Sequence, residues 1–127
     1  MKQAMFKAAV EAMANSHSPY SRFPVGAALL TEQGTIYCGC NVENASYPEG
    51  WCAETSAIAQ MVTAGETRIQ AILVTAEKKD RATPCGGCRQ RLAEFADPQT
   101  PVYLCDQSGV AETVLLGDLL PMNFDLD

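Results

Sequence analysis

Two short segments of the chain carry cysteines at a spacing that suits a single metal ion. The segment CAE occupies residues 52–54, and PCGGC follows about thirty residues later at 84–88. Two thiols separated by two residues can bind the same tetrahedral ion, and the intervening glycines let the backbone wrap closely around it. Both segments stand where a predicted helix begins, and the unpaired N–H groups of a helix start favour anions such as thiolates. The two segments therefore predict a metal centre.

The number of thiols distinguishes two kinds of zinc site. Cys52, Cys85 and Cys88 would supply three ligands, whereas a structural zinc site is closed by a fourth protein ligand and a catalytic site leaves that position to water. A fourth ligand could in principle come from His17 or another cysteine, and nothing in their spacing favours one. A carboxylate beside a water-bearing zinc ion, here Glu54, generates hydroxide and moves protons. Taken alone, Glu54 would indicate a first-turn helix carboxylate. The bland interpretation of the three cysteines is a structural zinc site or unlinked core thiols.

The chain holds six cysteines, which in a short secreted protein would predict three disulfides. Charged residues within positions 2–11 interrupt every apolar stretch of the N-terminal segment, so no signal-peptide core is found there. We therefore expect a cytoplasmic protein with reduced thiols. The cysteines outside the metal motif lie in strand-like, apolar surroundings and are predicted to be small core residues: Cys38, Cys40 and Cys105.

Composition narrows the class of protein. Of 127 residues, 47% are hydrophobic and 19% are charged, a mixture typical of one globular domain rather than a disordered chain. We expect that single domain to span residues 1–127. No apolar run approaches the roughly 18 to 20 residues that a membrane helix requires. The formal charge of −6 repels phosphate backbones, so neither a membrane nor a nucleic acid is expected as a partner.

Hydrophobic periodicity predicts an α/β fold. Helices are expected over residues 1–14, 52–64 and 85–96, with a short helical turn at 117–121, and strands are expected over residues 25–31, 35–42, 69–76, 102–106 and 112–116. The first two strands read as a hairpin, and the later strand–helix–strand alternation implies a parallel pair. The expected architecture is a three-layer α-β-α sandwich around a mixed five-stranded sheet. Periodicity leaves the strand order open.

At this point the chain resembles a known family. Zinc nucleobase deaminases carry H-x-E followed by P-C-x-x-C, with cysteine permitted in place of histidine. The likeness to the small, all-cysteine, homotetrameric cytidine deaminases runs over nearly the whole chain, through FPVGAAL at 23–29, CNVENASY at 40–47, CRQRLAEF at 88–95 and LLPMNF at 119–124. The resemblance implies a cytidine deaminase-like fold, one Zn²⁺ ion per subunit, and a homotetramer with sites shared between subunits. The implied reaction is the hydrolysis of cytidine and 2′-deoxycytidine to uridine, 2′-deoxyuridine and ammonia in pyrimidine salvage.

The resemblance also implies roles for individual residues. Cys52, Cys85 and Cys88 would be zinc ligands and Glu54 the proton shuttle. The remaining residues would bind the nucleoside: Asn41 and Glu43 at the ribose 3′-hydroxyl, Phe23 against the pyrimidine, the backbone of Ala53 at the amide edge of the base, and Ala45, Tyr47 and Phe124 across a subunit boundary. From the residues alone, Asn41 and Glu43 could equally end a strand, Phe23 could be a core residue, and Tyr47 and Phe124 could pack locally. His17 reads as a solvated loop residue.

One position departs from the family pattern. Many relatives place an arginine directly after the catalytic glutamate, and this chain has Thr55 there. Three thiolates around Zn²⁺ leave a net negative charge, so nearby positive potential must compensate. We expect it from the two helix starts, from Arg89, and from a hydroxyl hydrogen bond between Thr55 and a sulfur. On this interpretation Arg89→Ala lowers activity and zinc retention more than Arg91→Ala does.

Two other functions fit the same residues. A deaminase of a cytosine-nucleoside antibiotic would share the zinc motif and differ in relative turnover. A zinc-stabilised binding module without catalysis would keep the metal but have no use for Glu54. An enzyme acting on polynucleotides is disfavoured by the acidic balance and by the lack of a basic strip.

Overall fold

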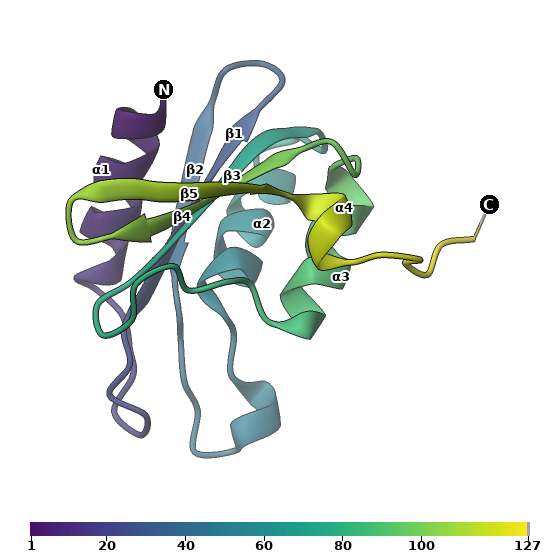
Figure 1. The fold of residues 1–127 in the computed structure, drawn as a ribbon. Helices are drawn as coiled ribbons and strands as arrows, with labels where there is room; N and C mark the ends of the chain where they lie inside the picture. The colour runs from purple at the N-terminus through teal and green to yellow at the C-terminus, as the bar shows by residue number, and fades with distance from the viewer. Residues whose placement is uncertain (127) are drawn as a thin grey trace.

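Five strands form one mixed sheet in the computed structural model, which describes residues 1–126 (Figure 1). The strands are β1 (Val25–Thr31), β2 (Ile36–Cys40), β3 (Ile69–Ala76), β4 (Pro101–Asp106) and β5 (Gly109–Leu115). Their order is β2-β1-β3-β4-β5. Only the β3–β4 pair is parallel, because the helix between them carries the chain back across the sheet. The predicted mixed sheet is confirmed, and the structure supplies the strand order. The predicted domain 1–127 includes Asp127, which lies outside the described residues.

Helices cover both faces of the sheet. They are α1 (Lys2–Met13), α2 (Ala53–Thr63), α3 (Gly86–Phe95) and α4 (Leu116–Leu119), with a short 3₁₀ helix, η1 (Tyr47–Glu49). Figure 1 shows α1 on one side and α2 and α3 on the other. Two separate clusters of buried side chains correspond to these faces, one containing Met5 of α1 and the other Met61 of α2 and Leu92 of α3. The three-layer sandwich is therefore confirmed.

Two glycines let helices approach the sheet unusually closely. A Cβ at Gly26 of β1 would lie 2.1 Å from the carbonyl oxygen of Ala9 in α1. A Cβ at Gly39 of β2 would lie 2.6 Å from the carbonyl oxygen of Ala53 and the amide nitrogen of Ala57. Since any larger side chain would push the first turn of α2 outward, Gly39 fixes where that helix begins.

The element bounds differ from the sequence prediction mainly beside the site. The second strand stops at Cys40 instead of residue 42, because the Val25 amide donates to the Asn41 side chain and the Asn41 carbonyl accepts from the His17 amide instead. The last strand begins at Gly109, three residues earlier than predicted. A helical turn at η1 also interrupts the stretch predicted to be a loop.

The cysteines outside the metal motif occupy two environments. Cys105 is buried against the α1 face, as predicted. Cys38 and Cys40 are only half-buried, so core filling was wrong for this pair, because β2 is an edge strand. All six cysteines are free thiols. Every helix within residues 1–126 is too short or too polar to span a bilayer.

Candidate metal centre and active site

The two metal-motif segments lie at the starts of α2 and α3. Cys52 is the N-cap of α2 and Cys85 is the N-cap of α3, both with extended backbone, and Cys88 lies in the first turn of α3. Neither helix has a side-chain hydrogen bond at its cap. The N–H groups of both first turns are thus left to face an anion, as a thiolate site requires.

The three sulfur atoms lie together. The Sγ atoms of Cys52, Cys85 and Cys88 all lie within 4.8 Å of one another, and the Sγ atoms of Cys52 and Cys85 are 3.6 Å apart. A tetrahedral zinc ion with Zn–S bonds of about 2.3 Å holds its sulfurs about 3.8 Å apart. Within residues 1–126 no other histidine, cysteine or carboxylate joins this group. The donor set therefore fits one zinc ion with a fourth position left open.

The sulfurs also interact electrostatically. A hydrogen bond from the Cys88 thiol lowers the pKa of Cys52. The same bond, followed by burial, raises the pKa of Cys88. The Thr55 hydroxyl lies 3.6 Å from the Cys88 sulfur, at the place predicted for it.

Glu54 is buried beside the sulfurs. Its exposed fraction is 3%, although it belongs to the first turn of α2. Burial raises the pKa of the Glu54 carboxyl, opposed by its own backbone N–H and by the charge of Arg91. A raised pKa brings a carboxyl closer to the range in which a general acid–base works.

A small cleft of about 170 Å³ brings Glu54 together with two of the sulfurs. Its lining residues come from the loop before β1, from β1 and β3, from the residue after β2, from the start of α2 and from the segment before α3. They are Phe23, Val25, Asn41, Cys52, Ala53, Glu54, Val74, Ala82, Thr83 and Cys85. The cleft is large enough for a single planar ring and has a carboxyl and thiols on one wall. This arrangement suits hydrolysis at a small aromatic ring.

Comparison with known proteins agrees with this geometry. The family model for the cytidine and deoxycytidylate deaminase zinc-binding region matches residues 1–104. The chain belongs to this family. A cytidine deaminase of Sporosarcina psychrophila is 45% identical over 114 residues, covering 90% of this chain and 84% of that protein. One of Halalkalibacterium halodurans is 41% identical over 123 residues, covering 97% and 93%.

Solved structures give the same result. The crystal structure of cytidine deaminase from Burkholderia pseudomallei superposes with a TM-score of 0.91 at 40% identity, over 98% of this chain and 99% of that one. That from Mycobacterium leprae superposes with a TM-score of 0.83 at 39% identity, over 94% and 97%. The cytidine deaminase fold thus extends over nearly the whole of the present chain.

Asn41, a predicted sugar ligand of this deaminase family, is held by the loop before β1. Its Oδ1 accepts hydrogen bonds from the Val25 amide at 3.0 Å and the Ser16 hydroxyl at 2.5 Å. Its Nδ2 donates to the Phe23 carbonyl at 2.9 Å. A primary amide has two N–H donors, so the second remains for a ligand at the cleft.

Glu43, the other predicted sugar ligand, binds the same loop. Its Oε1 accepts from the Tyr20 amide at 2.9 Å and the Ser21 amide at 3.1 Å, and its Oε2 accepts from the Ser21 hydroxyl. The hydrogen bond from Ser21 contributes most to lowering the pKa of Glu43, so the carboxylate is ionised at neutral pH. Nothing in the sequence pattern singled out Ser16 or Ser21, because their hydroxyls act across more than twenty residues of chain.

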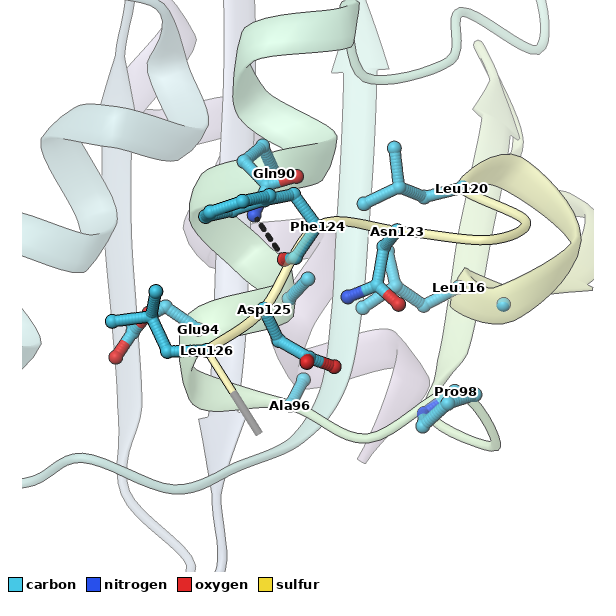
Figure 2. A pocket seen from close by; sticks show the side chains of 12 residues that line it. Gln90, Glu94, Ala96, Pro98, Leu116, Leu120, Asn123, Phe124, Asp125 and Leu126 are labelled. Atoms are coloured by element: carbon cyan, nitrogen blue, oxygen red, sulfur yellow. Dashed lines mark hydrogen bonds between the residues drawn. The ribbon is translucent and has the colours of Figure 1, made fainter.

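Glu43 lines a separate pocket, and three other predicted residues also lie outside the cleft. Tyr47 is 76% exposed, and its ring centroid lies 6.0 Å from that of Tyr20 beside Glu43. Ala45 is exposed on the same loop. Phe124 is 72% exposed and lines a separate cavity of about 630 Å³ between α3, α4 and the C-terminal residues, where Gln90 donates to its carbonyl (Figure 2). One subunit alone does not bring these residues to the sulfurs, and their roles stay predictions.

Arg89 is turned toward the chain around it. Its three donor nitrogens bind the Pro84 carbonyl at 2.7 Å, the Leu119 carbonyl at 2.9 Å and the Thr83 hydroxyl at 3.2 Å. These partners tie the segment before Cys85 to the end of α4. Arg89 therefore holds the cysteine loop in place, and its compensation of the thiolate charge stays a prediction.

Proposed function

We propose that the chain is a zinc-dependent hydrolase that converts cytidine and 2′-deoxycytidine to uridine and 2′-deoxyuridine with release of ammonia. The observation that carries the proposal is the cleft in which the buried Glu54 carboxyl meets a three-sulfur group with an open fourth position. Membership of the deaminase family supports the reaction, and the net charge of −6 favours a neutral nucleoside over a nucleic acid. Pyrimidine salvage in the cytoplasm is the role we infer for it.

Cys52, Cys85 and Cys88 would hold one zinc ion per subunit, and the bound ion would lower the pKa of a water so that hydroxide forms at neutral pH. Glu54 is placed to accept the proton released from that water and to deliver it to N3 of the base. It would then carry the second water proton to the amino group at C4, which leaves as ammonia. The water oxygen stays on C4, and its two protons end on N3 and on the departing ammonia, so the hydrolysis is balanced.

Three further residues of the cleft, together with Glu43 outside it, would orient the nucleoside. The free N–H of Asn41 and the ionised Glu43 supply one donor and one acceptor, which match a hydroxyl that both accepts and donates. Phe23 would pack on the pyrimidine, and the backbone of Ala53 would meet its amide edge. Holding the ring in one orientation is what makes proton delivery to N3 efficient.

We further infer a homotetramer whose sites are shared between subunits. Ala45, Tyr47 and Phe124 would approach a neighbour's nucleoside, and their exposure on the single chain supports this. A monomer with full activity would contradict the assignment of Tyr47 and Phe124 to the site.

The test is the decrease in cytosine absorbance when purified, zinc-loaded protein is added to cytidine. Glu54→Gln should keep its zinc and its fold but lose at least about 10³-fold in kcat. Glu32→Gln, an exposed carboxyl in the turn between β1 and β2, serves as the matched control and should behave as wild type.

Two outcomes would change the assignment. Faster turnover of a cytosine-nucleoside antibiotic than of cytidine would replace the substrate but keep the chemistry. If wild type and Glu54→Gln, both zinc-loaded, were equally inactive on every cytosine nucleoside tested, the protein would be a binding module.

A further inference from the structure

The loop before β1 contains a backbone conformation that other contacts must hold. Arg22 has φ 55°, in the left-handed region that non-glycine residues rarely adopt. It stands between Ser21 and Phe23, so it turns the chain just before Phe23, the residue predicted to contact the base. Its amide donates to the Ser18 carbonyl at 2.9 Å, which holds the turn from the N-terminal side.

The hydroxyl of Ser21 holds the turn from the other side. A serine hydroxyl has a single proton to donate, and Ser21 donates it in a hydrogen bond to Oε2 of Glu43. The Oγ atom of Ser21 in turn accepts a hydrogen bond from the Phe23 amide at 3.1 Å. Ser21 therefore joins a carboxylate predicted to recognise the sugar to the backbone of the residue predicted to contact the base.

Asn41 holds Phe23 from the opposite direction, because its Nδ2 donates to the Phe23 carbonyl at 2.9 Å. Both peptide groups of Phe23 are thus held by residues of the sugar site, one directly and one through Ser21. A shift of Glu43 would move the amide of Phe23, and a shift of Asn41 would move its carbonyl. Glu43 and Asn41, predicted to bind the sugar, are therefore linked by hydrogen bonds to Phe23, predicted to contact the base.

We propose that Ser21 is a positioning residue that couples recognition of the sugar 3′-hydroxyl to the packing of Phe23 on the base, an inference that rests on the function proposed above. A nucleoside that fully engages Glu43 fixes Oε2, and through Ser21 it fixes Phe23 as well. Ser21 is exposed on the single chain, so its effect comes from the geometry it imposes and not from the strength of one buried bond.

The experiment compares cytidine with 3′-deoxycytidine in wild type and in Ser21→Ala. We expect Ser21→Ala to raise KM for cytidine about threefold to tenfold while kcat changes less, and to weaken the preference for cytidine over 3′-deoxycytidine by a similar factor. Ser21→Thr keeps the hydroxyl and should restore most of the preference. Ser108→Ala, in the turn between β4 and β5, is the matched serine control and should equal wild type.

Two further measurements do not depend on turnover. Calorimetric binding of uridine and 3′-deoxyuridine should show the same loss of preference in Ser21→Ala. Amide hydrogen exchange should become faster at Phe23, because its N–H loses its acceptor. The double variant Ser21→Ala, Glu43→Gln should lose little more of the preference for the 3′-hydroxyl than Glu43→Gln alone.

The outcomes separate the two proposals. If wild type turns over cytidine but Ser21→Ala keeps the full preference for the 3′-hydroxyl, or loses kcat equally on both nucleosides, the coupling role of Ser21 is wrong and the deaminase function stands. If zinc-loaded wild type neither turns over nor binds cytosine nucleosides or their products, the proposed function is wrong and the coupling proposal falls with it.

Discussion

One part of the candidate site, the metal wall, consists of three sulfur atoms that meet at two helix starts. In another part, the loop wall, Asn41 and Glu43 are tied into the loop before β1 by hydrogen bonds. The sulfurs have few protein partners besides one another and the Thr55 hydroxyl. The oxygen and nitrogen atoms of the loop wall are almost fully engaged with the chain itself. The loop wall is therefore held by the chain itself, whereas the sulfurs of the metal wall remain available to a metal ion.

Removal of the metal should give the largest contrast between the two walls. After dialysis against a strong zinc chelator, turnover should fall to background, because no activated water remains. Amide exchange at Tyr20 and Ser21 should stay as slow as in the zinc-loaded protein, since Glu43 holds both amides without help from the metal.

Added Zn²⁺ should restore turnover in proportion to the zinc bound. Full turnover by protein shown to be free of metal would contradict the assignment of the sulfurs. Loss of protection at Tyr20 and Ser21 on chelation would show that the two walls are not independent.

Substitution of two arginines of α3 should have smaller effects than metal removal, and the effects should differ between zinc affinity and kcat. Arg89 is bonded to Pro84 and Leu119, so Arg89→Ala should loosen the loop that carries Cys85 and lower zinc affinity by about tenfold. The Arg91 guanidinium lies over Gly87, 3.2 Å from where a Cβ would be, and its charge acts on Glu54. Arg91→Ala should keep the zinc and lower kcat only about twofold to fivefold.

Zinc affinity is measured by competition with a chromophoric chelator, and kcat on fully loaded protein. Arg89→Lys and Arg91→Lys are the matched controls: the lysine at 89 cannot replace three hydrogen bonds, whereas the lysine at 91 keeps the charge. Equal losses of zinc in the two alanine variants would contradict separate roles for the two residues.

The metal wall could be predicted from the sequence, and the loop wall could be predicted only in part. Cys85 with Cys88, and Cys52 with Glu54, stand at short spacings at the starts of helices, so each half of the site is set by local geometry. Only the meeting of the two halves, thirty-three residues apart, depends on the fold. Ser21 and Glu43 are joined across twenty-two residues through a turn at Arg22 that has no periodic pattern. The family resemblance pointed to Asn41 and Glu43 as sugar ligands, but not to the loop that each of them holds.

Two other outcomes have the same cause. Arg89 follows Cys88 in sequence, yet its side chain turns to carbonyl groups of Pro84 and Leu119 that only the folded chain brings near. Cys38 was predicted to be a core residue from its apolar neighbours, but the strand order, which periodicity leaves open, puts it on an edge strand. Contacts that depend on long-range topology were the ones that local patterns missed.

The smallest expected effect is the pH dependence of the loop wall. The pKa of Glu43 is lowered from its ordinary value of about 4.5, first by the Ser21 hydroxyl and then by the Ser21 and Tyr20 amides, with a contribution from His17. Because the folded pKa lies below the unfolded one, the stabilisation of the loop is fully present above pH 4.5 and is lost as the pH falls through the lower, folded value. KM for cytidine in wild type should therefore stay constant from about pH 8 down to about pH 5.

In Ser21→Ala the largest cause of the lowered pKa is gone, so Glu43 should take up its proton at a higher pH than in wild type and KM should begin to rise earlier on acidification. The pH profile of KM, read beside that of kcat, distinguishes the walls, since Glu54 and the metal would govern kcat. Identical KM profiles for wild type and Ser21→Ala would mean that the Ser21 hydroxyl does not hold the Glu43 carboxylate in solution.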